Sequence, residues 1–172
     1  TTAAGTLERK ICPIPRTGRL ELSYSQLRLW LLNKLEPDSP AYNMVQPIQI
    51  NGKLDINALE RSLNEIVRRH EILRTNYVMD ETGPVQVIAG GKAIALEVVE
   101  IDQSGVQNRV IEETLKRFDI SKDMLIRFQL FKLDEDEYLL CIYVHHIAFD
   151  GWSLAVFMRE LGSLYPGLLK GE

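Results

Sequence analysis

The segment that decides the fold reads YLLCIYVHHIAFDGWS and extends from Tyr138 to Ser153. The run up to Val144 is apolar at both alternating sets of positions, which predicts a strand in the middle of a sheet, covered on both faces. The strand leads directly into His145 and His146, and a helix is expected to begin near Ser153, which we interpret as its cap. Rigid strand ends beside open loops often hold catalytic groups. We therefore expect a functional site directly after this strand.

The segments before this strand alternate between helical and extended patterns. Ser23 and Gln26 have the spacing of a capping box, and Asp55 is a typical N-cap of a second helix. Pro47 interrupts an extended segment, which predicts an edge strand because proline cannot donate to a ladder on both sides. The buried stripe of the first helix is expected to hold Leu27, Trp30, Leu31 and Leu35. We expect helices over about 23–36, 55–71, 106–118 and from 153, and strands over 44–50, 75–79, 85–89, 94–101, 125–133 and 138–144.

The order of these elements predicts the fold class. Helices and strands are interleaved, and the strands between 75 and 101 are expected to form a hairpin or a meander. We predict an α/β (α+β) two-layer sandwich, with helices packed on a mixed β-sheet.

Composition narrows the classes of function. A length of 172 residues suffices for a sizeable core, and the formal charge of -4 comes without a dense run of Lys or Arg, so no nucleic-acid partner is expected. Cys12 and Cys141 have neither disulfide nor metal-ligand spacing, so we expect no metal and read Cys141 as a small buried hydrophobe. Residues 1–19 lack the apolar core of a signal peptide and read as a leader or interdomain linker. We expect no membrane segment, a reducing cytoplasmic location and, from the start at Thr1, a piece of a longer protein.

The residues after the strand leave several roles open. Two adjacent histidines on an extended backbone point to opposite faces, so at most one can face a given cleft. Gly151 would permit a backbone conformation closed to other residues. Asp150 and Ser153 would complete a triad with His146, a reading that we disfavour because Ser153 is better explained as a helix cap.

Three motifs occur in a fixed order along the chain. His145 to Gly151 fit the pattern HHxxxDG, Ser23 to Trp30 read SYSQLRLW, and Arg69 to Tyr77 read RHEILRTNY. With these motifs the chain resembles the condensation domains of nonribosomal peptide synthetases from about Leu20 to its end. It is similar more widely to chloramphenicol acetyltransferase-like enzymes. The segment Ser39-Pro40-Ala41-Tyr42-Asn43 resembles members that accept an L-residue from upstream.

The resemblance assigns roles to single residues. It implies that His146 is the catalytic histidine, emerging from a central strand into a cleft, and we expect His145 on the other face to be structural. His146 would take a proton from the attacking amine, stabilise the tetrahedral intermediate, or mainly orient an amine that is already partly neutral near pH about 8. Asp150 is implied to form a structural ion pair with Arg74, whose loss from either side would cost about 3 to 5 kcal/mol. Gly151 is expected to line the substrate channel, with a plain turn glycine as the alternative.

The resemblance also implies a V-shaped domain of two lobes with the active site in a tunnel between them. Residues 20–172 would form the N-terminal lobe, the C-terminal lobe would be absent from this chain, and the isolated chain would be inactive. The implied reaction joins an upstream acyl or peptidyl thioester to the amine of a downstream aminoacyl thioester, in the biosynthesis of a secondary metabolite.

The implied partners are a donor and an acceptor peptidyl carrier protein and an adenylation domain of the same synthetase. The carrier proteins would present phosphopantetheine, and no cofactor would be bound permanently. Alternatives are an epimerization domain, a free coenzyme A-dependent acyltransferase of the same fold, and a non-catalytic lobe on which a carrier protein docks. Heterocyclization is disfavoured because those domains replace the two histidines with aspartates.

Overall fold

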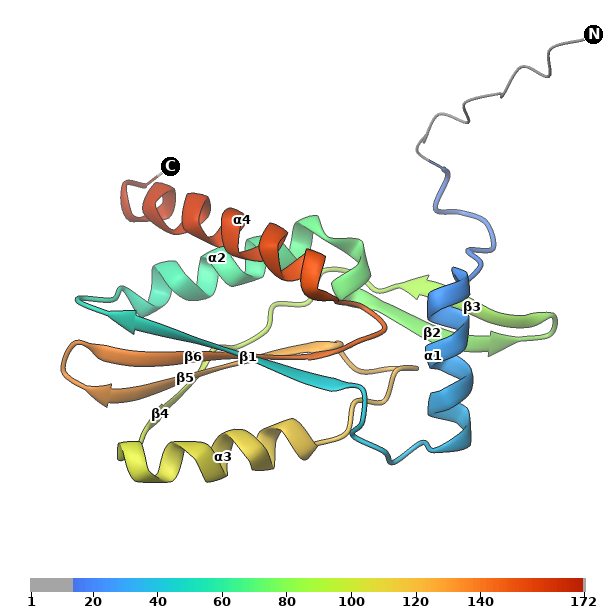
Figure 1. Cartoon of the computed structure of the whole chain (residues 1–172). Coiled ribbons are helices and arrows are strands. Elements are labelled where there is room, and N and C mark those ends of the chain that lie inside the picture. Colours follow the sequence, from blue (N-terminus) through green and yellow to red (C-terminus); the bar gives the residue numbers. More distant parts are fainter. Residues whose placement is uncertain (1–13, 172) are drawn as a thin grey trace, which may run out of the picture.

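The computed structural model describes residues 14–171, in which helices surround a central sheet (Figure 1). Residues 1–13, which include Cys12 and most of the predicted leader, lie outside the described residues. No helix in the described part is both long enough and apolar enough to cross a membrane. The elements follow in the order α1 (Tyr24–Leu35), β1 (Asn43–Asn51), α2 (Ile56–Arg69), the short 3-10 helix η1 (Glu71–Arg74), β2 (Thr75–Asp80), β3 (Gly83–Ile88), β4 (Glu97–Glu100), α3 (Gln103–Leu115), β5 (Ile126–Asp134), β6 (Glu137–His145) and α4 (Gly151–Leu169).

The strand β6 lies inside a four-stranded sheet with the order β1-β6-β5-β4, so the predicted central strand is confirmed. It pairs antiparallel with β1 and β5, whereas β4 pairs with β5 in parallel, which makes the sheet mixed. Pro47 lies opposite Cys141 in the edge strand β1, as its missing N–H predicted. Of the strands expected between 75 and 101, only β2 and β3 form a hairpin, because β4 joins the large sheet.

Alternate residues of β6 pack into two separate apolar cores. Leu140 and Ile142 belong to the core that α2 and α4 share, and Cys141 and Tyr143 belong to the core that includes Val106 of α3. Figure 1 shows α2 and α4 together on one face of the sheet and α3 across the other. The α/β class with helices on a mixed sheet is therefore confirmed, and α3 adds a second helical layer to the expected sandwich.

Helix α1 lies beside the β2–β3 hairpin and does not cover the large sheet (Figure 1). Its predicted capping box forms, since Gln26 N–H donates to Ser23 Oγ at 3.2 Å and Ser23 N–H donates to Gln26 Oε1 at 2.8 Å. Trp30 is buried, but Leu31 is 49% and Leu35 78% exposed. The predicted buried stripe was wrong at these two leucines, because the helix packs on the core through Trp30, Leu27 and Leu29 instead.

The chain before α1 runs along the hairpin. Gln86 N–H donates to the carbonyl of Leu20 at 2.8 Å, and Arg16 pairs with Glu71 at 2.8 Å. The described part of the predicted linker therefore contacts the lobe that follows it.

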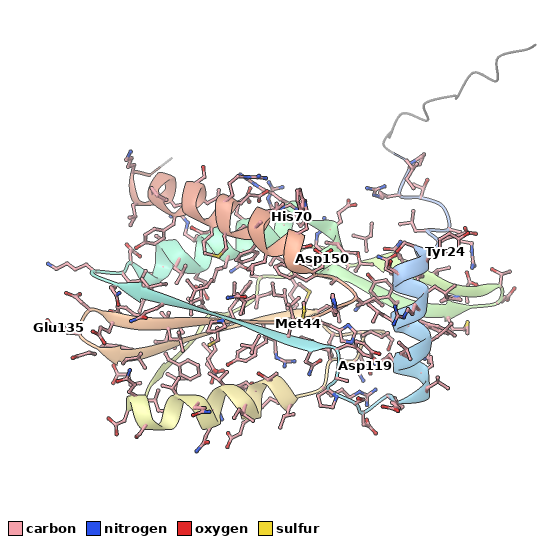
Figure 2. The ribbon with its side chains drawn as sticks, in the orientation of Figure 1. Tyr24, Met44, His70, Asp119, Glu135 and Asp150 are labelled. Atoms are coloured by element: carbon pink, nitrogen blue, oxygen red, sulfur yellow. The ribbon has the colours of Figure 1, made fainter. Side chains whose placement is uncertain are left out.

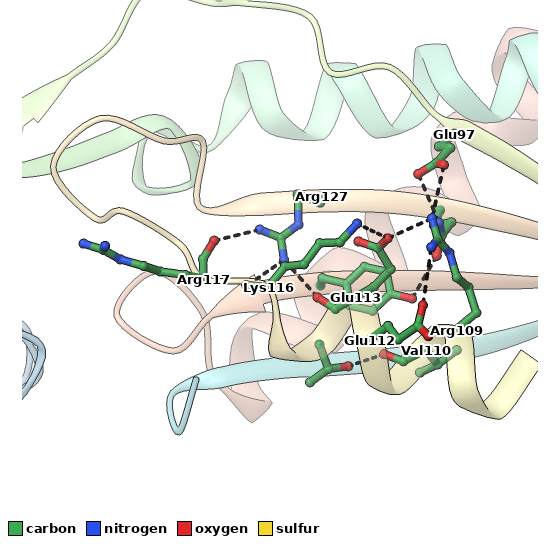
Figure 3. Close-up of polar contacts among 11 residues, drawn as sticks. Glu97, Arg109, Val110, Glu112, Glu113, Lys116, Arg117 and Arg127 are labelled. Atoms are coloured by element: carbon green, nitrogen blue, oxygen red, sulfur yellow. Dashed lines mark hydrogen bonds and ion pairs between the residues drawn. The ribbon is translucent and has the colours of Figure 1, made fainter. Parts of the chain in front are cut away.

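Arg127 of β5 fastens the end of α3 to the sheet (Figure 3). Its guanidinium donates to the carbonyls of Glu113 and Lys116 at 3.1 Å each and of Arg117 at 3.4 Å. It also lies 3.8 Å from the ring centroid of Phe118. The last carbonyls of a helix have no partner within the helix, and Arg127 supplies donors to them, which it shares at Lys116 with the side-chain amide of Asn43.

Candidate active site

The backbone is held from two sides where β6 ends. His146 N–H donates to the carbonyl of Tyr42 at 2.8 Å, and His145 N–H donates to the carbonyl of Leu125 at 3.1 Å. Ala148 N–H then returns to the carbonyl of His145 at 3.0 Å and closes a tight turn. These bonds fix the directions in which the two imidazoles leave the strand.

His145 is buried, with 2% of its surface exposed. Its Nδ1 accepts the N–H of Ile147 at 3.1 Å, and its ring meets the ring of Phe118 edge-on, with the centroids 6.3 Å apart. Burial, and after it the charge on neighbouring His146, lowers the pKa of His145 to about 4. A neutral ring suits this place because an accepting nitrogen carries no proton. His145 therefore braces the loop and does not face the solvent.

His146 is the exposed member of the pair. Its Nδ1 lies 2.8 Å from the carbonyl oxygen of Phe149. A carbonyl oxygen only accepts, so Nδ1 carries the proton and the lone pair of the neutral ring lies on Nε2. Among residues 14–171, Nε2 has no hydrogen-bond partner. The imidazole is thereby prepared to accept a proton or a hydrogen bond from a substrate at Nε2.

A cavity of about 520 Å³ lies beside His146. Its walls come from the first half of α1, from η1 and from the loop between β6 and α4, which Asp150 marks in Figure 2. A smaller and mainly apolar hollow of about 260 Å³ adjoins it through Ile72 and Phe149, which line both. The residues that line the larger cavity are Ser23, Ser25, Gln26, Arg28, Leu29, Tyr42, Ile72, His146, Ile147, Ala148, Phe149, Asp150 and Ser153.

Asp150 is the N-cap of α4. One carboxylate oxygen accepts the N–H of Ser153 at 2.8 Å and its hydroxyl at 2.7 Å, and these bonds lower the pKa of Asp150. The prediction that Ser153 is the cap was therefore wrong by one helical turn, because a carboxylate before Gly151 meets the free N–H groups and the positive end of the helix. The disfavoured triad does not form, since the Nδ1 of His146 is bonded to Phe149.

Gly151 is the first residue of α4 and does not have a positive φ. A Cβ built there would meet no atom within 4 Å, and Gly151 does not line the cavity of His146. Within the described residues, the expectation of a special backbone conformation at Gly151 was therefore wrong, whereas its place in the wall of a two-lobed channel stays a prediction.

The predicted ion pair between Arg74 and Asp150 does not form within residues 14–171. Arg74 Nη1 instead donates to the carbonyl of Ala89 at 2.7 Å, and its Nη2 lies 4.0 Å from a carboxylate oxygen of Glu71. Asp150 is exposed and occupied by the first turn of α4. Each group is already bonded by nearer partners, Arg74 by the carbonyl of Ala89 and Asp150 by Ser153, which is the physical reason for the correction.

Sequence reasoning missed Tyr42 and Ile72 as walls of the cavity. A signal for Tyr42 existed in the segment 39–43, which the resemblance had singled out, and in the structure Asn43 lies opposite His145. Ile72 gave none, because its place depends on the packing of η1. Among residues 14–171 no group of three or more His, Cys, Asp or Glu could hold a metal ion.

Comparison with known proteins identifies the family. The condensation domain family matches residues 17–172. This chain belongs to the condensation domain family. Condensation domain relatives include chondramide synthase of Chondromyces crocatus, 40% identical over 160 residues, which are 89% of this chain and 4% of that protein. Nonribosomal peptide synthetase TES of Alternaria alternata is 32% identical over 162 residues, which are 94% of this chain and 3% of that protein.

The fold agrees with this membership. The crystal structure of the X-domain from teicoplanin biosynthesis is 33% identical and superimposes with a TM-score of 0.86, over 93% of this chain and 35% of that chain. This condensation domain chain therefore spans a few per cent of its curated relatives and about a third of that solved structure.

Proposed function

We propose that this chain supplies the catalytic histidine, His146, of a domain that forms peptide bonds in a nonribosomal peptide synthetase. The observation that carries the proposal is the setting of His146 itself: exposed beside a cavity, with Nδ1 bonded to Phe149 and Nε2 left for a substrate. Family membership supports the same reading.

The proposed chemistry uses one nitrogen of the chain. The downstream amine attacks the carbonyl carbon of the upstream thioester with its lone pair, and Nε2 of His146 accepts the proton that this nitrogen loses. The C–S bond of the tetrahedral intermediate then breaks, its electron pair leaves on sulfur, and the thiolate takes the proton from the imidazolium. The products are an amide and a thiol. If the attacking amine is already neutral, His146 would orient it by accepting a hydrogen bond at the same lone pair on Nε2.

We propose that a donor and an acceptor peptidyl carrier protein present these thioesters on phosphopantetheine, in the cytoplasm, beside an adenylation domain. The names of the relatives, one a synthase and one a nonribosomal peptide synthetase, support this assignment. An upstream L-residue as donor is proposed from the segment 39–43, of which Tyr42 lines the cavity. Residues 1–19 would link this lobe to what precedes it.

We further propose that residues 20–172 are an N-terminal lobe that needs a second lobe to enclose the cavity. The solved X-domain chain is about three times as long as the part that this chain matches, and His146 is exposed in the described residues. The isolated chain is then expected to show negligible turnover.

The test is amide formation in a synthetase module that contains this chain, with both carrier proteins loaded. His146→Ala is expected to lower product formation by about a hundredfold or more, because loss of a general base costs that much. His70→Asn is the control, since His70 bonds Glu160 and does not line the cavity of His146.

Each other function has its own outcome. A product with an inverted α-carbon and no new amide would assign epimerization. Acyl transfer from free acyl-coenzyme A to a free amine would assign the free acyltransferase. Carrier binding with equal, negligible turnover in the unchanged module and in His146→Ala would assign a docking lobe.

A further inference from the structure

Gln26 of α1 makes more bonds than a helix cap requires. Its Oε1 accepts the N–H of Ser23 at 2.8 Å and so completes the capping box. Its Nε2 donates to the hydroxyl of Tyr77 at 3.1 Å and to Oε1 of Gln86 at 3.2 Å. The side chain therefore joins α1 to both strands of the β2–β3 hairpin.

Tyr77 in turn bonds the loop after β6. It is 1% exposed, and its hydroxyl, which accepts from Gln26, reaches the carbonyl of Ile147 at 3.4 Å. Burial raises the pKa of Tyr77 to about 12, so the phenol keeps its proton. A buried hydroxyl proton needs an acceptor, and the carbonyl of Ile147 is the acceptor within reach in the described residues.

The backbone N–H and the backbone carbonyl of Ile147 are therefore both hydrogen-bonded. Its N–H donates to Nδ1 of His145, and its carbonyl accepts from Tyr77. Ile147 directly follows His146, and two residues later the carbonyl of Phe149 holds Nδ1 of His146. A shift of Ile147 would move the carbonyl of Phe149 relative to the imidazole of His146. The tautomer of His146 therefore depends on the two hydrogen bonds that fix the backbone of Ile147.

We propose that Gln26 and Tyr77 are positioning residues that keep the loop of His146 in the form in which Nδ1 is protonated and Nε2 is free. The first sequence motif, which Gln26 belongs to, thus acts on the chemistry through Tyr77, in addition to lining the cavity of His146. Only the effect on rate rests on the proposed function, because the tautomer is a property of this chain alone.

Two substitutions remove the relay in different ways. Tyr77→Phe deletes the hydroxyl. Gln26→Glu keeps a side-chain oxygen that can accept the N–H of Ser23, but it loses the N–H donor to Tyr77. The hydroxyl of Tyr77 is then expected to donate to the new carboxylate and no longer to the carbonyl of Ile147. The matched control is Tyr143→Phe, since Tyr143 is also 1% exposed and its hydroxyl bonds a glutamine, Gln129, at 3.1 Å.

The first measurement is nitrogen NMR of the full chain labelled at histidine, at a pH well above the usual imidazole pKa. In the unchanged chain and in Tyr143→Phe, His146 should show Nδ1–H as its main tautomer. In Tyr77→Phe and Gln26→Glu it should show a mixture of tautomers. Hydrogen exchange of the Ile147 and Ala148 amides should be about two- to tenfold faster in these two variants, as the loss of one net hydrogen bond allows.

The second measurement is the rate of amide formation in a synthetase module that contains this chain. Tyr77→Phe should lower kcat in proportion to the loss of the Nδ1–H tautomer, about twofold for an equal mixture, with KM unchanged. Gln26→Glu should lower kcat in the same proportion, and Tyr143→Phe should not. If all three variants lose only stability and His146 keeps its tautomer, the positioning role is overturned. If the tautomer changes as expected but no variant affects amide formation, the relay stands and the proposed function of His146 is refuted.

Discussion

Lowering the pH should destabilise this chain through His145. Folding lowers the pKa of His145 from 6.5 to about 4, first through burial and second through the charge on His146. Below pH 6.5 the unfolded chain binds a proton that the folded chain excludes, so the free energy of unfolding falls with pH and levels off below about pH 4. One pKa unit is worth about 1.4 kcal/mol, so the full loss is about 3 kcal/mol, about half of it between pH 6.5 and pH 5.

The carboxylates with lowered pKa values act in a lower range of pH. Hydrogen bonds from Arg68 and Arg69 lower the pKa of Glu65 from 4.5 to about 2, and hydrogen bonds led by the Ser121 hydroxyl lower that of Asp119 from 3.8 to about 2. Their stabilisation is present above the usual carboxyl pKa and is lost only as the pH falls below it. The interval from pH 6.5 to pH 5 therefore lies above the range of these carboxylates, and the other two histidines are the same in both proteins compared below.

The assay is urea unfolding across that interval for the unchanged chain and for His145→Asn. The amide oxygen of asparagine lies at about the reach of Nδ1 and can accept the N–H of Ile147, but it does not titrate. The unchanged chain should lose about 1.5 kcal/mol, and His145→Asn should have a nearly flat profile. Equal pH slopes in the two proteins would refute the assignment to His145.

Three further substitutions test particular contacts. Arg127→Met should lower the free energy of unfolding in urea by about 2 kcal/mol, because three carbonyls at and after the end of α3 lose their guanidinium donor. Arg117→Met, at a half-exposed site, should change it by less than about 0.5 kcal/mol. Equal effects of the two substitutions would contradict the role of Arg127. Asp150→Ala should lower the free energy of unfolding by about 1 kcal/mol, because the helix α4 loses its cap. In a double-mutant cycle with Arg74→Ala, the two effects should add within about 0.5 kcal/mol. A coupling of several kcal/mol would show that the two side chains form an ion pair after all. Gly151→Ala should raise thermal stability by up to about 1 kcal/mol, since the new Cβ has open space, and a marked loss would reveal a neighbour of Gly151.

The central strand and most helix starts were readable from the sequence because their signals are local. The continuous apolar run up to Val144 required cover on both faces, and two cores provide it. Ser23 and Asp55 were found as caps because their side chains bond their own helices. Asp150 was missed as a cap because the family motif had already given its carboxylate another role.

What the sequence could not predict depends on packing between distant segments. The exposure of Leu35 follows from the place of α1 beside the hairpin, and no periodicity within the helix records that place. The pairing of β4 with β5 is a parallel contact across α3, which a pattern of short strands does not distinguish from a meander. At the site, the local order of His145 and His146 was readable, but the carbonyl that sets the tautomer of His146 was not.

Both rims of the large sheet are poor templates for another copy of the chain. At one rim Pro47 interrupts the row of donors in β1, and at the other β4 is four residues long with a glutamate at each end. Strand addition between molecules, the usual route from an open sheet to fibrils, is therefore unfavourable here. Self-association of concentrated protein should proceed instead through bare apolar side chains such as Leu35 and Trp152, and mild detergent rather than denaturant should reverse it.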